Sequence, residues 1–347
     1  MTPDPAPTAE STTAALAGHQ PVRADWLARH SEAPLAPDQE IVDAHHHFFS
    51  GGDWRYLTDE LTADIAQAPG LSATVFVECG EHHRPAGPAA VRPVGETEFV
   101  RDLTPVASAG RVRLAAAIVG TADLRAPTAD AVLHAHLDAG DGRFRGIRQS
   151  IAWDPDPAVT HPRRQPPPGL YAAAEFRRGF RRLAPLALTF DAWCFHPQIP
   201  DVTDLARAFP GTRIVLDHCG GPLGVGGHAG PEAFRTWRAH LAELARCDNV
   251  VVKIGGLGMT AIGHRFFAEA SPPTSTRLAA TLRPWVHSVI ELFGAHRCMF
   301  ESNFPVDKAS YAYGVFWNAC TRLAEEAGAD ERAALFADTA RDFYRLP

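Results

Sequence analysis

The chain has 347 residues and a formal net charge of −7. It has no basic cluster, and this charge balance argues against nucleic-acid binding. No apolar run reaches the roughly 18 residues that a membrane-spanning helix needs, so we expect no membrane partner. The length suits one α/β domain with a large core.

Residues 1–33 are predicted to be a disordered or extended tail, and residues 34–347 a single domain. Met1–Gln20 is rich in Pro, Ala and Thr and has neither the basic start nor the apolar centre of a signal peptide. The six cysteines are far apart and form no C-x-x-C pair, which is typical of free thiols in a reducing cytoplasm. We therefore expect a cytoplasmic protein that acts on a small molecule; the sequence leaves a homo-oligomer open.

Short apolar runs alternate with longer amphipathic ones along the chain. The predicted strands begin at Ile41 and then cover Ala73–Cys79, Arg113–Val119, Phe144–Ser150, Leu186–Ala192, Arg213–His218, Asn249–Ile254 and Arg297–Asn303. The predicted helices cover Tyr56–Ala68, Gly95–Ala109, Ala129–Ala139, Tyr171–Leu183, Asp201–Phe209, Pro231–Cys247, Ser275–Phe293 and Tyr313–Ala327. This rhythm predicts an α/β fold, a single-domain (β/α)8 TIM barrel. An open doubly wound sheet is the alternative, but no G-x-G-x-x-G follows any strand.

The first predicted strand ends in a cluster of histidines, Ile41–Phe49. Asp43, His45 and His47 alternate along it, so they should share one face of the strand while His46 faces the other way. Two imidazoles on one face suit a divalent metal such as zinc. The alternative is a strand end whose histidines only form hydrogen bonds.

Ionisable or polar residues also end most of the other strands. They are Glu78, Arg148, Asp191 with His196 just beyond it, His218, Lys253, Glu301 and Asn303. Such groups are costly to bury without partners. Because the carboxyl ends of barrel strands converge on one face, we expect these residues to form one site.

Several motifs carry a resemblance to a known family. They are Asp43-x-His45-x-His47, Leu216-Asp-His218-x-Gly220, Val252-Lys253 and Met299-Phe-Glu-Ser-Asn-Phe-Pro-Val-Asp307. From about Pro34 onwards the chain resembles the amidohydrolase-related TIM-barrel proteins. That group includes sugar lactonases, 2-pyrone-dicarboxylate lactonase and non-oxidative decarboxylases of the aminocarboxymuconate-semialdehyde type. The chain is most similar to a branch that ends strand eight in Ser-Asn-Phe-Pro-Val-Asp.

The resemblance implies roles for the histidines. His45 and His47 would ligate a divalent ion, usually zinc, with His196 as the candidate third ligand. His218 matches a histidine that acts as a general acid or base or polarises the substrate. Relatives have Asp at the position of Asn303, and a carboxamide cannot replace Asp as a base.

Strand alternation places Glu301 on the same face as Asn303, one layer deeper and near His45 and Lys253. Glu301 either takes over the missing carboxylate role or forms a structural ion pair with Lys253, and the sequence leaves both open. A metal-free mechanism, with His and Arg groups polarising the carbonyl, is a further alternative.

The expected function is hydrolysis of a small lactone, or a similar cyclic ester or amide, by water attack at a polarised carbonyl. Arg148 would hold a substrate carboxylate through its planar fork, with Glu78 and Asp191 completing the substrate pocket. A decarboxylase of the same fold and a non-catalytic ligand-binding barrel are the alternatives. The Pro-rich loop Asp154–Gly169 is expected to form a fixed wall of the site.

Overall fold

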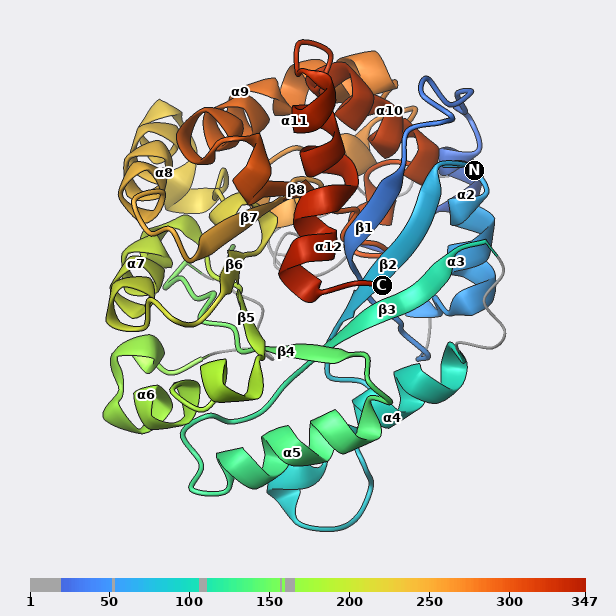
Figure 1. The fold of residues 1–347 in the computed structure, drawn as a ribbon. Coiled ribbons are helices and arrows are strands. Elements are labelled where there is room, and N and C mark those ends of the chain that lie inside the picture. The colour runs from blue at the N-terminus through green and yellow to red at the C-terminus, as the bar shows by residue number, and fades with distance from the viewer. Residues whose placement is uncertain (1–19, 52–53, 106–110, 157, 160–165) are drawn as a thin grey trace, which may run out of the picture.

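The computed structural model describes residues 20–51, 54–105, 111–156, 158–159 and 166–347. The predicted tail over residues 1–19, the end of the helix predicted over Gly95–Ala109, and part of the Pro-rich loop lie outside the described residues. Eight strands form one sheet in the order in which they occur along the chain, and every neighbouring pair is parallel (Figure 1).

The strands are β1 (Ile41–His46), β2 (Leu71–Val77), β3 (Arg113–Gly120), β4 (Phe144–Arg148), β5 (Thr189–Ala192), β6 (Ile214–Leu216), β7 (Val250–Ile254) and β8 (Cys298–Phe300). The segment after β8 returns to β1, because the Asn303 nitrogen donates to the His45 carbonyl at 2.9 Å and the His47 nitrogen to the Phe304 carbonyl at 2.8 Å. These contacts close the ring, and the predicted (β/α)8 barrel in one domain is confirmed.

Helices occupy the connections between the strands and surround the sheet (Figure 1). They are α3 (Thr58–Ile65), α4 (Val94–Leu103), α5 (Ala129–Ala139), α6 (Ala174–Phe180), α7 (Ile199–Ala208), α8 (Pro231–Leu244), α9 (Ser275–Phe293) and α10 (Tyr313–Leu323). Helix α9 illustrates the local causes. Thr274 caps it by accepting from the Arg277 nitrogen at 3.2 Å, and Leu278, Leu282 and Val289 on one face are buried.

The C-terminal segment was not predicted from the sequence. After α10, helix α11 (Ala329–Ala333), a π-helical turn (Ala334–Asp338) and α12 (Thr339–Tyr344) follow one another. Phe343 and Tyr344 pack with Val42 and Val75 of the barrel interior, so α12 closes the amino end of the barrel. The Tyr344 hydroxyl reaches inwards and donates to Asp191 Oδ2 at 2.7 Å.

Part of the predicted tail is ordered against the barrel. Residues 20–33 include the short helix α2 (Ala24–Leu27), and Trp26 in it is buried. The Trp26 indole donates to the Glu269 carbonyl at 2.9 Å. Residues 20–33 thus pack on the barrel, with burial of the Trp26 side chain as one contribution.

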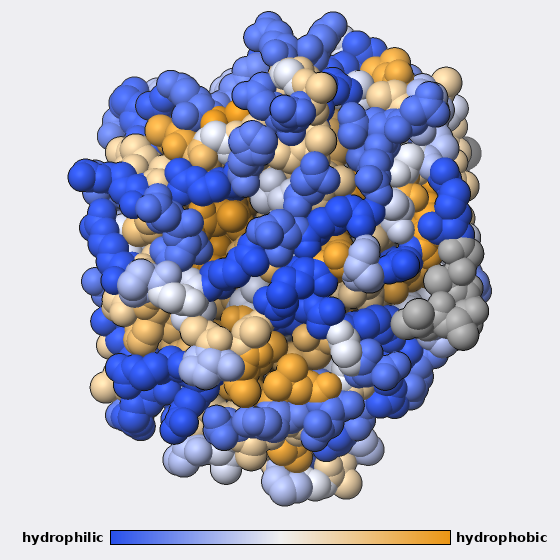
Figure 2. Space-filling model, viewed as in Figure 1, coloured by the Kyte–Doolittle hydropathy of each residue, from blue (hydrophilic) through white to orange (hydrophobic). Residues whose placement is uncertain are grey.

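The face of the molecule in Figure 2 is mainly hydrophilic, with small hydrophobic patches between the polar residues. Among the described residues, Leu35 is the one large hydrophobic side chain that is exposed. No helix in the described ranges combines the length and the apolar character needed to span a bilayer.

Candidate active site

A register shift at the end of β1 decides which side chains enter the barrel. Asp43 pairs with Thr74 but His46 with Phe76, so β1 has one more residue than β2 between these pairs. Asp43 therefore does not lie beneath His45 and His47, as alternation had predicted. Its carboxyl accepts from Ser302 Oγ at 2.6 Å and from Tyr313 of α10 at 2.9 Å, and burial raises its pKa to about 6.

His45 and His47 meet inside the barrel, with their Nε2 atoms 3.2 Å apart. His47 Nδ1 lies 2.7 Å from the Val77 carbonyl, which can only accept, so Nδ1 carries the proton and Nε2 keeps its lone pair. Burial, and then the charges of Lys253 for His45 and Arg148 for His47, hold both pKa values well below the usual range. Both rings are neutral and can act as ligands.

His218 and Glu301 form a buried dyad. Glu301 Oε1 lies 2.6 Å from His218 Nδ1 and also accepts from the His218 backbone nitrogen at 3.1 Å. The proton sits on Nδ1, because a carboxylate only accepts, so Nε2 presents a lone pair. Among the contacts of the described residues, the His218 ring bonds through Nδ1 only.

The backbone around His218 is shaped to present this ring. His218 itself has φ +55°, which a residue with a side chain rarely adopts. Gly256, at φ +65°, leaves the necessary space, since a Cβ there would lie 2.5 Å from the His218 Cβ and Cγ. The Trp193 ring packs against His218, with 4.7 Å between the ring centroids.

Lys253 forms no ion pair with Glu301, so of the two alternatives left open for Glu301 the structural ion pair is not found. Its ammonium lies 2.6 Å from Asp191 Oδ2 and 3.1 Å from Asp217 Oδ1. Burial opposes the charge of Lys253, but Asp191 and Asp217 outweigh burial and raise its pKa above the usual value. His45 Nδ1 lies between the two expected partners, 3.1 Å from Lys253 Nζ and 3.1 Å from Glu301 Oε2.

Asp191 is consequently part of the barrel floor, not of an open substrate pocket. It accepts from both Lys253 and Tyr344 and is fully buried. Arg148 is held by Glu78, with Nε 2.8 Å from Glu78 Oε1 and a second contact to the Glu78 carbonyl. Its Nη1 lies 3.4 Å from His45 Nε2. Arg148 and Glu78 therefore flank the histidines as a preformed pair.

One predicted member of the site, His196, has its contacts outside it. His196 Nδ1 accepts from the Leu223 nitrogen at 3.2 Å, and its ring packs on His228. The proton of this neutral imidazole must then sit on Nε2, so His196 has no lone pair for a metal. The group of nearby metal-ligand atoms among the described residues consists of His45, His218 and Glu301, and contains neither His196 nor His47.

Asn303 lies beside the site, since its backbone nitrogen donates to the His45 carbonyl at 2.9 Å. Its side-chain amide nitrogen donates to Asp307 Oδ1 at 3.0 Å. Asp307 accepts in addition from Tyr311 and the Gly258 nitrogen, and burial raises its pKa to about 6. Asn303 is therefore not the proton acceptor, because a carboxamide is a very weak base and its amide nitrogen is already bonded to Asp307.

Sequence reasoning missed Asp217, Trp193 and Asp307. Asp217 was visible in the Leu216-Asp-His218 motif and Asp307 at the end of the strand-eight motif, but neither was given a role. Trp193 carries no polar signal that would have marked it. The described part of the loop after β4 reaches the site through Trp193: Val159 lies in a cluster with Phe195 and Leu223, and Trp193, whose ring contacts His218, packs against that cluster.

The residues fit a divalent cation on the Nε2 side of the two histidines. Two imidazole nitrogens about 2.0–2.1 Å from a tetrahedral zinc ion would lie about 3.3 Å apart, close to the 3.2 Å between His45 Nε2 and His47 Nε2. On the other side of the His45 ring, the ammonium of Lys253 already occupies the position beside Nδ1. The nearby Arg148 guanidinium would weaken cation binding by repulsion.

The family model and the lactonase relatives identify this barrel as an enzyme of the hydrolase class. The chain belongs to the amidohydrolase family, whose model matches residues 42–346. It is 30% identical over 321 residues to L-fucono-1,5-lactonase of Burkholderia ambifaria, covering 88% of this chain and 95% of that protein. It is also 34% identical over 291 residues to an uncharacterized protein of Sinorhizobium fredii, covering 84% and 86%.

A solved structure shows the same architecture. An amidohydrolase from Burkholderia multivorans, crystallised with bound zinc, is 27% identical, with a TM-score of 0.68 over 89% of this chain and 100% of that one. The expected family is therefore confirmed, as is a lactonase-like hydrolase at the level of reaction class.

Proposed function

We propose that this enzyme hydrolyses a lactone of a sugar acid, with His218 as general base. The single observation that carries this proposal is the His218–Glu301 dyad, whose oriented imidazole directs the Nε2 lone pair away from Glu301. The similarity to L-fucono-1,5-lactonase supports the substrate class, because it extends over 88% of the chain.

In this mechanism a water molecule attacks the lactone carbonyl carbon while His218 Nε2 takes its proton. The resulting imidazolium is stabilised by Glu301, which lies 2.6 Å from Nδ1. When the tetrahedral intermediate collapses, the bond from the carbonyl carbon to the ring oxygen breaks. His218 then returns the proton to that oxygen, which leaves a hydroxy acid and the imidazole in its starting form.

The carbonyl needs a positive partner as charge develops on its oxygen. Arg148 is the fixed cation beside the histidines, and burial makes its charge more effective than it would be in water. Zinc, held by His45 and His47, would act as a Lewis acid on the same oxygen. Glu78 keeps Arg148 in place and offers a carboxylate beside it as an acceptor for a sugar hydroxyl.

The test is a panel of 1,5- and 1,4-lactones of sugar acids, followed by acid release, with carbon dioxide release from aromatic carboxylates measured in parallel. We expect lactone opening, and a kcat lower by about 10²–10⁴ in His218→Asn, with the fold retained. Carbon dioxide release without lactone opening would replace the proposal with the decarboxylase alternative. Full lactonase activity in His218→Asn would remove His218 as the base.

A further inference from the structure

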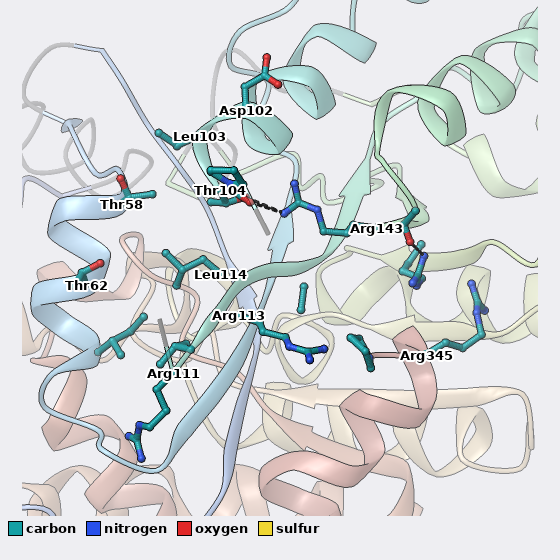
Figure 3. A pocket seen from close by; sticks show the side chains of 17 residues that line it. Thr58, Thr62, Asp102, Leu103, Thr104, Arg111, Arg113, Leu114, Arg143 and Arg345 are labelled. Atoms are coloured by element: carbon teal, nitrogen blue, oxygen red, sulfur yellow. Dashed lines mark hydrogen bonds between the residues drawn. The ribbon is translucent and has the colours of Figure 1, made fainter. Parts of the chain in front are cut away.

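A cavity lies at the amino end of the barrel, at the end opposite the candidate active site. It has a volume of about 830 Å³ and is bordered by the starts of β3 and β4, the end of α4, the first turns of α3 and the segment after α12 (Figure 3). None of the residues that line it belongs to the site at the carboxyl ends of the strands. Any ligand of this cavity would therefore contact a separate set of side chains.

Five arginines line this cavity: Arg111, Arg113, Arg143, Arg145 and Arg345. Asp102 is the one acidic side chain among the lining residues, and it already pairs with Arg101 at 2.8 Å. Arg111, Arg113 and Arg345 form no side-chain hydrogen bond and no ion pair with any described residue. The cavity therefore concentrates positive charge in a chain whose net charge is −7.

The two less exposed arginines are fixed by backbone carbonyls instead of carboxylates. Arg143 is 8% exposed and donates to the carbonyls of Thr104 and Ala115 at 3.0 and 3.1 Å, while its Nε is buried without a partner. Arg145 Nε donates to the Tyr344 carbonyl at 2.8 Å. These bonds hold the guanidinium groups in place without a direct ion pair; the Asp141 carboxylate offsets part of the effect of burial on the pKa of Arg143, which is nevertheless lowered.

The charges also act on one another. Burial first, and then the neighbouring Arg345, lower the pKa of Arg145. Burial and Arg213 lower that of Arg345 in the same way. Mutual repulsion of this kind is relieved when an anion binds, so the free energy stored in the cluster favours an anionic ligand.

Apolar side chains form the remaining wall of the cavity. Leu103, Val112 and Leu114 line it beside the arginines. In Figure 3, Arg113 extends from β3 towards the segment that carries Arg345, while Leu114 lies on the α3 side of the strand. A ligand would thus meet guanidinium forks on one side and hydrocarbon on the other.

We propose that this cavity is a binding site for a small organic polyanion. Its ligand would carry at least two negative charges, on carboxylate groups or on a phosphate group. Planar guanidinium groups bind such oxyanions through paired hydrogen bonds, and both carboxylates and phosphate monoesters fit the fork. The volume of about 830 Å³ suits a ligand of this size.

The test is isothermal titration of the full chain at physiological ionic strength with three probes: citrate, phenyl phosphate and benzoate. We expect citrate or phenyl phosphate to bind with micromolar to millimolar Kd, and the monoanion benzoate at least tenfold more weakly. Citrate binding alone would assign a carboxylate ligand and phenyl phosphate alone a phosphate ester. Absence of binding by both would overturn the proposal.

The double variant Arg113→Gln/Arg345→Gln tests whether the anion binds in this cavity. Both side chains are exposed and lack partners among the described residues, so the fold and the lactonase activity should be unchanged. We expect Kd for the polyanion to rise at least tenfold, whereas the matched variant Arg283→Gln, on the exposed face of α9, should bind like the parent. Equal binding by the parent and the double variant would show that the anion binds elsewhere, and would overturn the proposal.

Discussion

Glu301 Oε1 accepts from both the ring and the backbone nitrogen of His218, at 2.6 and 3.1 Å. One carboxylate oxygen thus fixes the orientation of the ring and the conformation of the residue that carries it. The sequence left open whether Glu301 or His218 is the base; the geometry favours His218 as the base and Glu301 as its positioning residue.

Glu301→Gln should therefore lower kcat by about 10²–10⁴ while KM changes little, because the charge that stabilises the imidazolium is lost but substrate contacts remain. Steady-state kinetics on a responsive lactone and circular dichroism of the same samples provide the measurement. Glu243→Gln, on the exposed surface of α8, is the matched control. Parental kcat in Glu301→Gln would rule out the dyad.

Lys253→Met should lower the free energy of unfolding by about 3–5 kcal/mol, because it leaves Asp191 and Asp217 buried without their cation. Lys308→Met removes the only other lysine, whose ion pair with Asp64 is partly exposed, and should cost less. Urea unfolding of both variants and the parent measures the difference. Equal losses would contradict the assignment of Lys253 to the barrel floor.

His47→Gln should reduce zinc occupancy at least tenfold after loading with zinc and gel filtration, since it removes one of the two facing Nε2 atoms. His196→Gln should retain the parental occupancy, because His196 Nδ1 is taken by the Leu223 nitrogen. Elemental analysis measures both. A parent that binds no zinc and keeps its activity in chelator would favour the metal-free alternative.

Asn303→Asp should destabilise the protein more at pH 8 than at pH 5. The new carboxylate would replace an amide that donates to Asp307 at 3.0 Å, and two adjacent carboxylates must share a proton or repel. Burial already raises the pKa of Asp307 to about 6, and a raised carboxyl pKa means that stability is lost as the pH rises through it. Urea unfolding at both pH values should give a difference of about 1–3 kcal/mol between variant and parent at pH 8.

His136 of α5 should make the protein acid-sensitive. Its buried ring contacts Thr97 of α4 and stacks on Phe144. Burial lowers its pKa from 6.5 to about 4, so the folded state excludes a proton that the unfolded chain binds below pH 6.5. Stability is therefore present above pH 6.5 and lost as the pH falls towards 4, by about 2 kcal/mol between pH 7 and 5. His136→Gln should reduce the loss by that amount in thermal or urea unfolding; an unchanged pH dependence would contradict the assignment.

The barrel could be predicted from the sequence because each strand and helix carries its own periodicity. Helices α5 and α9 begin and end at the predicted residues, since their buried positions recur with the period of a helix and mark it locally. The end of the barrel that carries the site followed from topology alone, because parallel strands bring their carboxyl ends together. The C-terminal helix α12 was missed although Phe343 and Tyr344 are large apolar residues, because a short helix gives a weak periodic signal.

The partners within the site could not be predicted in the same way. The shift in β1 register that turns Asp43 towards α10 depends on contacts with a distant strand, and alternation along β1 alone gives the wrong face. The pairing of Lys253 with Asp191 and Asp217 was likewise hidden, because neighbouring strands suggested Glu301 as its partner. His196 follows a strand end like the true site residues, and only its contact with Leu223 separates it from them.

Tyr344 forms part of the barrel floor and bonds to Asp191, so the floor is still open when the segment after β8 has closed the ring of strands. Residues 339–344 lie about forty positions after β8, so a ribosome that has just released the last strand still holds the segment that seals the interior. During that interval the charged group formed by Asp191 and Lys253 lacks its cover. The interior of the barrel can therefore be sealed only after this late segment has folded.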